Sequence, residues 1–265
     1  MTLHGAAILR EEAASAKEGY TRAVLLAIYD ALSSHYGPQH WWPTRSGSAW
    51  EIMLGAVLTQ RTTWRNVDIA LDNIERAWGE RGLSDPQAIL SASEEELVKL
   101  TRPTGHYKSK PRKLQALARF VLEHGGVQAL IESPESTETL RARLLGIWGI
   151  GPETADAILL YALNRPMFVA DAYALRLASR WGLLKPTAIY KEIQRLFMEN
   201  LPHDVALFNE YHALIVTHGK ELCRPYPLCE ACPLNRILPL DVTPTEVNNW
   251  RCPWPLAKEE EVSVL

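Results

Sequence analysis

The sequence predicts an all-α protein built from two helical lobes. Apolar residues recur along most of the chain with the period of an α-helix, and glycine and proline separate these segments. Only residues 167–170 resemble a strand, and a segment this short has little opportunity to pair. We therefore expect a helical fold without a β-sheet.

The expected helices follow from apolar side chains that repeat on one face. These faces consist of Trp50, Met53, Leu54 and Val57; Val67, Ala70, Leu71, Ile74 and Trp78; Leu114, Leu117, Ala118 and Val121; Ile189, Ile193, Leu196 and Phe197; and Phe208, Tyr211, Leu214 and Ile215. Ser93 and Glu96 have the spacing of a capping box at the start of a helix. Helix breaks are expected at residues 85–86, 133–134, 149–152, 185–186 and 201–202.

The charge of the chain is unevenly distributed. The formal net charge of −3 gives no overall sign of a nucleic-acid-binding protein, but the distribution of charge matters more than its sum. Residues 99–113 contain six Lys or Arg and no acidic residue. A run of this kind usually forms a solvated face, and contact with phosphate is the less common outcome.

No targeting or membrane segment is expected. No apolar run reaches the roughly 18 residues of a membrane-spanning helix. Residues 1–19 include Glu11 and Glu12 and have no continuous apolar stretch, unlike a signal peptide. We expect a cytoplasmic, nucleoid-associated monomer that does not bind membranes.

Residues 144–176 contain the richest motif. Gly149 and Gly151 allow a tight turn after an apolar helix, and Pro152 suits the first position of the next helix. The N–H groups at such a helix start can bind a DNA phosphate without a basic side chain. A glycine turn of this type is by itself more often an ordinary connection between helices. Asp171 follows shortly after the second helix and precedes another expected helix that begins at Ala172.

The hairpin, the Gly/Pro-rich loop and the aspartate together resemble the endonuclease III, or HhH-GPD, superfamily of helix-hairpin-helix DNA glycosylases. The resemblance extends over roughly residues 20–232. It implies that Asp171 is the catalytic carboxylate, which stabilises positive charge on the sugar and can orient or deprotonate the attacking water. Asp171 can also cap the helix that follows, and the two roles are compatible.

The resemblance also predicts which activity is missing. Family members that cleave the DNA strand carry a lysine at the position of Glu153, where the amine forms a Schiff base with the sugar. No lysine occurs between Lys113 and Lys185, although a distant lysine could still fold into the site. We therefore expect base excision without strand cleavage, with Glu153 at the DNA-binding hairpin.

Residues 40–67 are expected to recognise the base. Gln60 matches the family position that fills the gap left by a flipped base, although it could equally cap the preceding helix. The motif that contains Trp41, Trp42 and Pro43, followed by Trp64, resembles the 3-methyladenine glycosylase branch, in which such positions form the base pocket.

Aromatic faces bind an electron-poor alkylated base well, so these side chains favour an alkylated substrate. The alternative is that these tryptophans belong to a core or an interface between domains. Because Trp41 and Trp42 are adjacent, they are not expected to share one environment.

All four cysteines lie after residue 220, which favours a metal site over disulfides in a reducing compartment. Cys223, Cys229 and Cys232 stand where endonuclease III relatives carry a [4Fe–4S] loop, but the expected nearby fourth cysteine is absent. Cys252 is the remaining candidate, 19 intervening residues further on. A [4Fe–4S] cluster is the preferred interpretation; a zinc site with the same four thiolates or an empty site are the alternatives.

These expectations combine into one hypothesis. Residues 47–165 would form a helical barrel with the hairpin, and residues 1–46 would join residues 166–265 in a cluster lobe, with the two lobes flanking a DNA cleft. The protein would be a monofunctional glycosylase that flips a damaged, alkylated base out of double-stranded DNA and hydrolyses its N-glycosidic bond. A catalytically silent DNA-binding paralogue and an iron–sulfur redox module are the alternatives.

Overall fold

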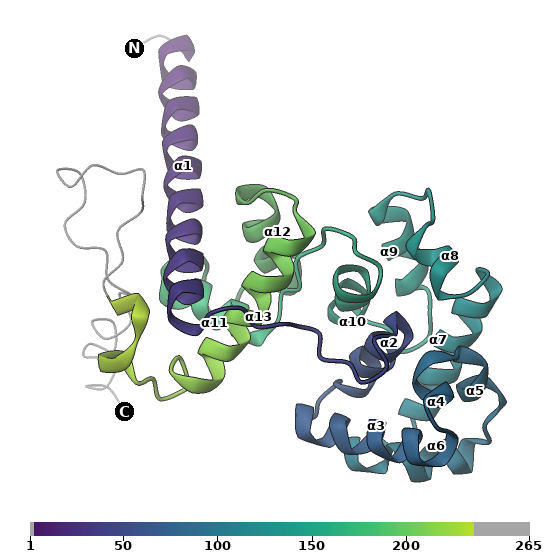
Figure 1. Cartoon of the computed structure of the whole chain (residues 1–265). Coiled ribbons are helices and arrows are strands. Elements are labelled where there is room, and N and C mark those ends of the chain that lie inside the picture. The colour runs from purple at the N-terminus through teal and green to yellow at the C-terminus, as the bar shows by residue number, and fades with distance from the viewer. Residues whose placement is uncertain (1–2, 236–265) are drawn as a thin grey trace. The chain divides into compact units, whose positions relative to one another are not determined.

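The computed structural model describes the backbone of residues 3–235 and the side chains of residues 19–235. Every regular element in this range is helical, so the predicted all-α fold is confirmed, and residues 167–170 are irregular. The chain forms two compact units (Figure 1). We call residues 40–169 the hairpin unit, and residues 1–39 with 170–265 the terminal unit.

The hairpin unit contains a succession of short helices. They are α2 (Ala49–Leu58), α3 (Trp64–Trp78), α4 (Arg81–Ser84), α5 (Pro86–Ser91), α6 (Glu94–Thr101), α7 (Lys110–Glu123), α8 (Val127–Ile131), α9 (Thr137–Leu145) and α10 (Pro152–Ala157), with the 3₁₀ turn η1 (Arg102–Thr104) and the π-helical turn η2 (Ile158–Ala162). The expected cap at Ser93 is present, since its hydroxyl accepts a hydrogen bond from the backbone N–H of Glu96.

Helix α2 forms the centre of the hairpin unit. It contacts α3, α4, α7, α10 and η2, and nearly all of its side chains are buried. Trp50, Met53, Leu54 and Val57 are fully buried, so the predicted apolar face lies in the core. Burial of this face is the main source of stability for a helix too short to persist alone.

The terminal unit is built around α13 (Val205–Glu221). Helices α1 (Leu3–Tyr36) and α11 (Ala172–Arg180) pack against α13, and α12 (Tyr190–Asn200) packs against α1 and α11 (Figure 1). Tyr211 anchors the unit, because its hydroxyl donates a 2.7 Å hydrogen bond to the carbonyl of Leu25 and its ring contacts those of Tyr29 and Phe197. The 3₁₀ turns η3 (Cys229–Ala231) and η4 (Pro233–Asn235) follow α13.

Three expectations differ from the structure. Ile189 was placed on the apolar face of a helix, but it precedes α12 as its N-cap residue and is 64% exposed. The first helix begins at Leu3 instead of near residue 20. The unit boundaries lie at residues 39/40 and 169/170, whereas 46/47 and 165/166 were expected.

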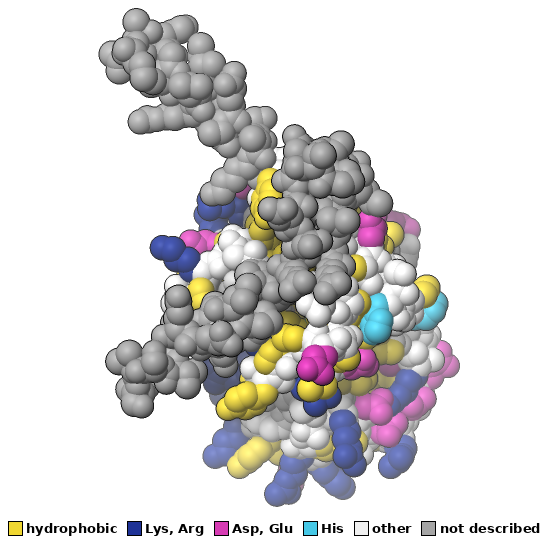
Figure 2. Space-filling view, turned by 90° about the vertical axis from the view of Figure 1, so that its left-hand side faces the viewer, with side chains coloured by type: hydrophobic (Ala, Val, Ile, Leu, Met, Phe, Trp, Pro, Cys, Tyr) yellow, Lys and Arg dark blue, Asp and Glu magenta, His cyan; other side chains and the backbone are white. Residues whose placement is uncertain are grey.

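The surface carries separate groups of basic and acidic side chains. On the face shown in Figure 2, these groups largely gather in different places, so the net charge of −3 does not describe the local charge. Within residues 3–235, no helix combines the length and the hydropathy needed to cross a membrane.

Candidate functional site

The hairpin between α9 and α10 depends on one glycine. Gly149 has a φ of 82°, and a Cβ at this position would lie 2.5 Å from the side chain of Lys113. A larger residue would therefore be both strained and obstructed. Gly151 was also expected to be needed for the tight turn, but its φ is −93° and a Cβ there would meet nothing within 4 Å. Gly151 and Glu153 are exposed at the start of α10.

Gln60, the predicted wedge, is tied to this hairpin. Its Nε2 donates to the carbonyl of Gly149 at 3.0 Å and to Oγ1 of Thr154 at 2.9 Å, while its Oε1 accepts from Nζ of Lys113 at 2.6 Å. These hydrogen bonds of its side chain run to the hairpin and to α7, so the side chain does not cap α2. Gln60 thus links three segments of the hairpin unit.

Two lysines from the basic run support this arrangement from the inside. Lys110 is fully buried and donates 2.7 Å hydrogen bonds to the carbonyls of Leu58 and Thr104. Burial, together with the charge of Lys113, lowers the pKa of Lys110 to about 8. The pKa of Lys113 is also lowered, mainly by burial and to a smaller extent by the charge of Arg61. The run is therefore not simply a solvated face.

The predicted base pocket is an aromatic cluster. The ring of Trp42 lies 5.3 Å from the rings of both Trp64 and Tyr161, and 5.9 Å from that of Trp41. Trp41 also contacts Tyr161, so the two adjacent tryptophans do share one environment, contrary to the expectation. The three tryptophans are partly exposed, and Pro43 is exposed.

Two features explain how the aromatic cluster is positioned. Gly55 of α2 leaves room for the Trp42 indole, since a Cβ there would lie 3.0 Å from Nε1 of that ring. Glu51 of α2, which is 1% exposed, accepts hydrogen bonds from the backbone N–H of Arg45 and Ser46 and from the Ser46 hydroxyl. The loop that carries the tryptophans is therefore fixed to α2.

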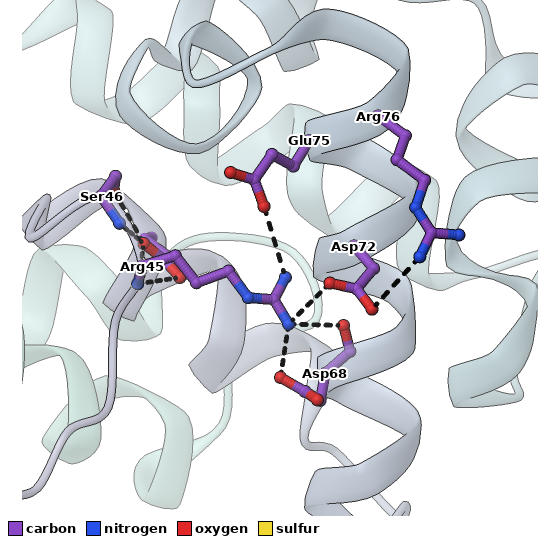
Figure 3. Close-up of polar contacts among 7 residues, drawn as sticks. Arg45, Ser46, Asp68, Asp72, Glu75 and Arg76 are labelled. Carbon is purple, nitrogen blue, oxygen red and sulfur yellow. Dashed lines mark hydrogen bonds and ion pairs between the residues drawn. The ribbon is translucent and has the colours of Figure 1, made fainter.

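The same loop is also fixed to α3 through Arg45. Its guanidinium forms ion pairs with Asp68, with Asp72 at 3.1 Å and with Glu75 at 3.9 Å (Figure 3). It also donates to the backbone carbonyl of Asp68 at 3.1 Å. Several acidic partners on one side chain restrict it more than an isolated surface pair would. The aromatic loop is thus held between α2 and α3.

Asp171 caps α11 in the terminal unit. Its Oδ1 accepts hydrogen bonds from the backbone N–H groups of Tyr173 at 2.9 Å and Ala174 at 2.8 Å. These donors and the helix N-terminus stabilise a negative charge on the carboxylate. Only 14% of the side chain is exposed.

Two cationic or protonatable side chains of α13 lie near this carboxylate. Nε2 of His212 is 3.6 Å from Oδ2 of Asp171, and the His212 side chain is buried. Lys220 lies close enough for its charge to interact with that of Asp171: burial lowers the pKa of Lys220, and the carboxylate of Asp171 opposes this shift. Asp171 therefore sits in a partly buried, polar environment.

The three described cysteines line one pocket of the terminal unit. The pocket is bounded by Leu177, Arg180, Trp181, His218, Leu222, Cys223, Pro227, Leu228, Cys229, Cys232, Leu234 and Asn235. Arg180, which is 5% exposed, donates a 3.0 Å hydrogen bond to Sγ of Cys223. A buried guanidinium needs hydrogen-bond acceptors, and the sulfur of Cys223 is one of them.

A histidine forms another wall of the cysteine pocket. Nε2 of His218 lies 3.7 Å from Sγ of Cys232, and its Nδ1 is 3.1 Å from the hydroxyl of Tyr36. Burial lowers the pKa of His218 to about 4, with smaller contributions from His35 and Arg180, so the ring is neutral at pH 7.

The donor set of the pocket, three cysteine sulfurs, is the kind that a thiolate-bound group requires. Within residues 3–235, no three Cys, His, Asp or Glu side chains converge closely enough to hold one metal ion. A cluster places each thiolate on a different iron and so needs ligands that stand further apart. Cys252, the predicted fourth ligand, lies outside the described residues.

Sequence patterns alone do not identify Tyr161 and His212 as site residues. Tyr161 reaches the tryptophans only because η2 packs against α2, and His212 meets Asp171 only because α13 packs against α11. Tyr161 lies within the motif at residues 144–176, but no pattern there links it to the tryptophans, and His212 belongs to no local motif. An aromatic or a histidine on a buried helix face was the sole available signal.

Comparison with known proteins gives the family. Residues 54–203 match the model of the HhH-GPD superfamily base excision DNA repair proteins. A proposed DNA repair glycosylase of Methanocaldococcus jannaschii is 42% identical over 212 residues, which cover 80% of this chain and 94% of that protein. Endonuclease III of Thermotoga maritima is 28% identical, over 68% of this chain and 78% of the relative.

Solved structures show the same fold. The H. pylori 3-methyladenine DNA glycosylase MagIII, bound to 1,N6-ethenoadenine, has a TM-score of 0.62 at 27% identity and covers 73% of this chain and 96% of that one. A non-covalent endonuclease III–DNA complex has a TM-score of 0.65 at 19% identity, covering 80% and 92%. The predicted superfamily is thereby confirmed: the chain belongs to the HhH-GPD superfamily of base excision DNA repair proteins.

Proposed function

We propose that this chain is a monofunctional DNA glycosylase that hydrolyses the N-glycosidic bond of an alkylated base in double-stranded DNA. The observation that carries the proposal is the cluster formed by Trp41, Trp42, Trp64 and Tyr161. Three of its four rings are partly exposed, whereas Trp50 in the same unit is fully buried. MagIII, with 27% identity, was solved with a modified adenine bound.

The cluster supplies what a flipped alkylated base needs. Alkylation leaves a purine electron-poor or positively charged, and the faces of tryptophan and tyrosine rings attract such a group. Stacking also compensates for the loss of base stacking in the duplex. The attachment of the loop to α2 and α3 through Glu51 and Arg45 keeps the rings in place before the base arrives.

Asp171 supplies the catalytic charge in this proposal. As the N-glycosidic bond breaks, the bonding electron pair leaves with the base and positive charge develops on the sugar. A fixed carboxylate stabilises that charge and accepts a proton from the water that attacks C1′. A positively charged alkylpurine departs as a neutral base, so a strong acid for the leaving group is not required.

The hairpin is the proposed phosphate-binding element. The exposed residues Gly151 and Glu153 begin α10, and a helix start offers backbone N–H groups to a phosphate. Gln60 remains the candidate that fills the gap left by the base. Insertion would require its amide to exchange the hydrogen bonds to Gly149, Thr154 and Lys113 for contacts with DNA.

Cys223, Cys229 and Cys232, with Cys252 as the fourth ligand, are the proposed ligands of a [4Fe–4S] cluster. The cluster would supply a structural cross-link for the segment after α13, because its four thiolate ligands come from separate positions in the chain. Arg180 supports this proposal, since it presents a buried positive charge to Cys223. Zinc bound by four thiolates is the alternative occupant.

We expect the wild-type protein to form no covalent adduct with DNA in the presence of borohydride. Trapping requires an imine between a lysine amine and the sugar, and Glu153 stands at the hairpin position where the resemblance places that lysine. The measurement is denaturing electrophoresis of protein, alkylated duplex and borohydride. An endonuclease III, for which a trapped covalent intermediate with DNA has been solved, provides the positive control.

An efficient adduct would contradict the monofunctional assignment and point to another amine. Lys113 is then the first candidate, because it packs against Gly149 and its pKa is lowered by burial. Trapping by the wild type that disappears in Lys113→Met would identify that lysine as the nucleophile.

Trp42→Ala and Trp64→Ala should each weaken base excision more than duplex binding. Loss of one stacking partner costs about 1–3 kcal/mol, or about 5- to 150-fold in the rate at low substrate concentration. Single-turnover release of methylated base, measured beside affinity for undamaged duplex, separates the two effects.

Trp78→Ala is the matched control, because Trp78 lies in the same unit but outside the aromatic cluster and donates to Glu96. It should leave base release unchanged. If Trp42→Ala and Trp64→Ala lower the melting temperature and merely reduce the folded fraction, the rings serve the core and the pocket assignment is wrong.

A further inference from the structure

We propose that His212 is a positioning residue that orients the Asp171 carboxylate for base excision. The inference rests on the catalytic role proposed for Asp171. Nε2 of His212 lies 3.6 Å from Oδ2 of Asp171, and both side chains belong to the terminal unit. The His212 side chain is 7% exposed and that of Asp171 14%, so water screens their interaction weakly.

The two carboxylate oxygens of Asp171 have different surroundings. Oδ1 accepts from the N–H groups of Tyr173 and Ala174, which fix that oxygen at the start of α11. These two bonds do not hold Oδ2, which lies 3.6 Å from Nε2 of His212. A contact from α13 thus restrains the oxygen that α11 does not hold.

The contact with His212 leaves one acceptor position of the Asp171 carboxylate open. A carboxylate has about four lone-pair positions. The two N–H groups of α11 use two of them, and an N–H on Nε2 of His212 would use a third once the 3.6 Å contact shortens by a few tenths of an ångström. One acceptor position then remains, on Oδ2, and its direction is fixed by the other three.

That remaining position suits the proposed reaction. The water oxygen forms a bond to C1′, the C1′–N bond breaks, and the electron pair leaves with the base. The proton lost by the water moves to Oδ2 of Asp171 and later to solvent. His212 keeps its own proton throughout, so its role is to orient Asp171 and to stabilise its charge.

Packing holds His212 in place for this role. The residue lies in the middle of α13, between the buried residues Tyr211 and Ala213, where α13 contacts α1 and α11. Lys220, near the C-terminal end of α13, also lies close enough to Asp171 for their charges to interact. Lys220 adds positive charge near Asp171, whereas His212 contacts a particular oxygen.

The test compares variants with and without a donor at this position. His212→Leu removes the N–H and should slow single-turnover release of methylated base by about 10- to 100-fold, the scale expected when a catalytic group is misplaced by about 1 Å. His212→Gln places an amide N–H near the position of Nε2 and should recover most of that loss. Affinity for duplex containing an abasic site should be unchanged in both, because the contact is made with Asp171 and not with DNA.

A double-mutant cycle separates positioning from a purely structural role. If His212 acts through Asp171, adding His212→Leu to Asp171→Asn should reduce the rate little further. Equal rates for His212→Leu and wild type, or full additivity in the cycle, would overturn the inference. If Asp171→Asn itself leaves the rate unchanged, the proposed function of Asp171 fails instead.

A second measurement keeps His212 in place, so it does not depend on whether His212→Leu folds. Asp171→Asn keeps the cap but removes the charge beside His212, so the ¹⁵N resonance of His212 Nε2 should shift. No shift in that resonance would show that the two side chains do not interact and would overturn the inference.

Discussion

Asp171→Asn is expected to lower the rate of base release by ~10²–10⁴-fold, the contribution typical of a positioned acid or base. An amide cannot stabilise a cationic sugar by charge, and it cannot accept the proton of the attacking water. The fold should tolerate the change, because asparagine caps helices about as well as aspartate and can still accept from Tyr173 and Ala174. The measurement is single-turnover release of methylated base.

Asp204→Asn is the matched control for this prediction. Asp204 caps α13 in the same way, accepting from the backbone of Leu207 at 2.7 Å, but it is exposed and is not part of the proposed site. It should leave the rate unchanged. Asp171→Asn should still bind duplex DNA, since loss of a carboxylate reduces repulsion from phosphate. Full activity in Asp171→Asn would contradict the catalytic assignment.

Cys229→Ser and Cys252→Ser should both bleach the purified protein, which we expect to be brown. A closed [4Fe–4S] site needs four ligands, and serine replaces a soft thiolate with a poor ligand for this cluster. Loss of the cluster should also lower the melting temperature, because the segment after α13 would lose its cross-link. Visible absorption, iron and sulfide content and thermal unfolding measure these effects.

The outcomes distinguish the ligand from the cofactor. An intact cluster in Cys252→Ser would remove Cys252 from the ligand set and leave the cofactor assignment standing. About one zinc per chain and no iron in the wild type would contradict the cluster itself. The retention of colour in Cys229→Ser would be the more serious result, because Cys229 lines the same pocket as Cys223 and Cys232.

Local features of the molecule could be predicted from the sequence because local chemistry determines them. The Ser93 cap and the start of α11 after Asp171 both depend on residues within one or two helical turns. Gly149 was predicted for the same reason, since a turn with positive φ favours glycine.

The contacts that shape the candidate site could not be predicted in this way. Gln60 bonds to Gly149 and Thr154, which are distant in sequence, and Lys110 is buried by carbonyls at the end of α2 and in η1. A buried lysine is rare, so a basic run gives no reason to expect one. These contacts depend on how the helices pack, which periodicity alone does not specify.

The aromatic loop shows the same limit. The tryptophans could be identified from the sequence. The expectation that Trp41 and Trp42 lie in different environments was wrong, because both contact Tyr161. The carboxylate of Glu51 could not be recognised as the anchor of this loop, since it lies on the otherwise apolar helix α2 and resembles an ordinary first-turn acid.

The most direct test of the proposed function is to measure released base and strand breaks in one reaction with methylated duplex DNA. We expect free methylated base to accumulate while the strands remain intact, and later treatment with alkali to cut them at the abasic sites. Duplex binding without release of base would indicate a catalytically silent paralogue. Strand breaks that appear before alkali, at the rate of base release, would contradict the proposed monofunctional glycosylase.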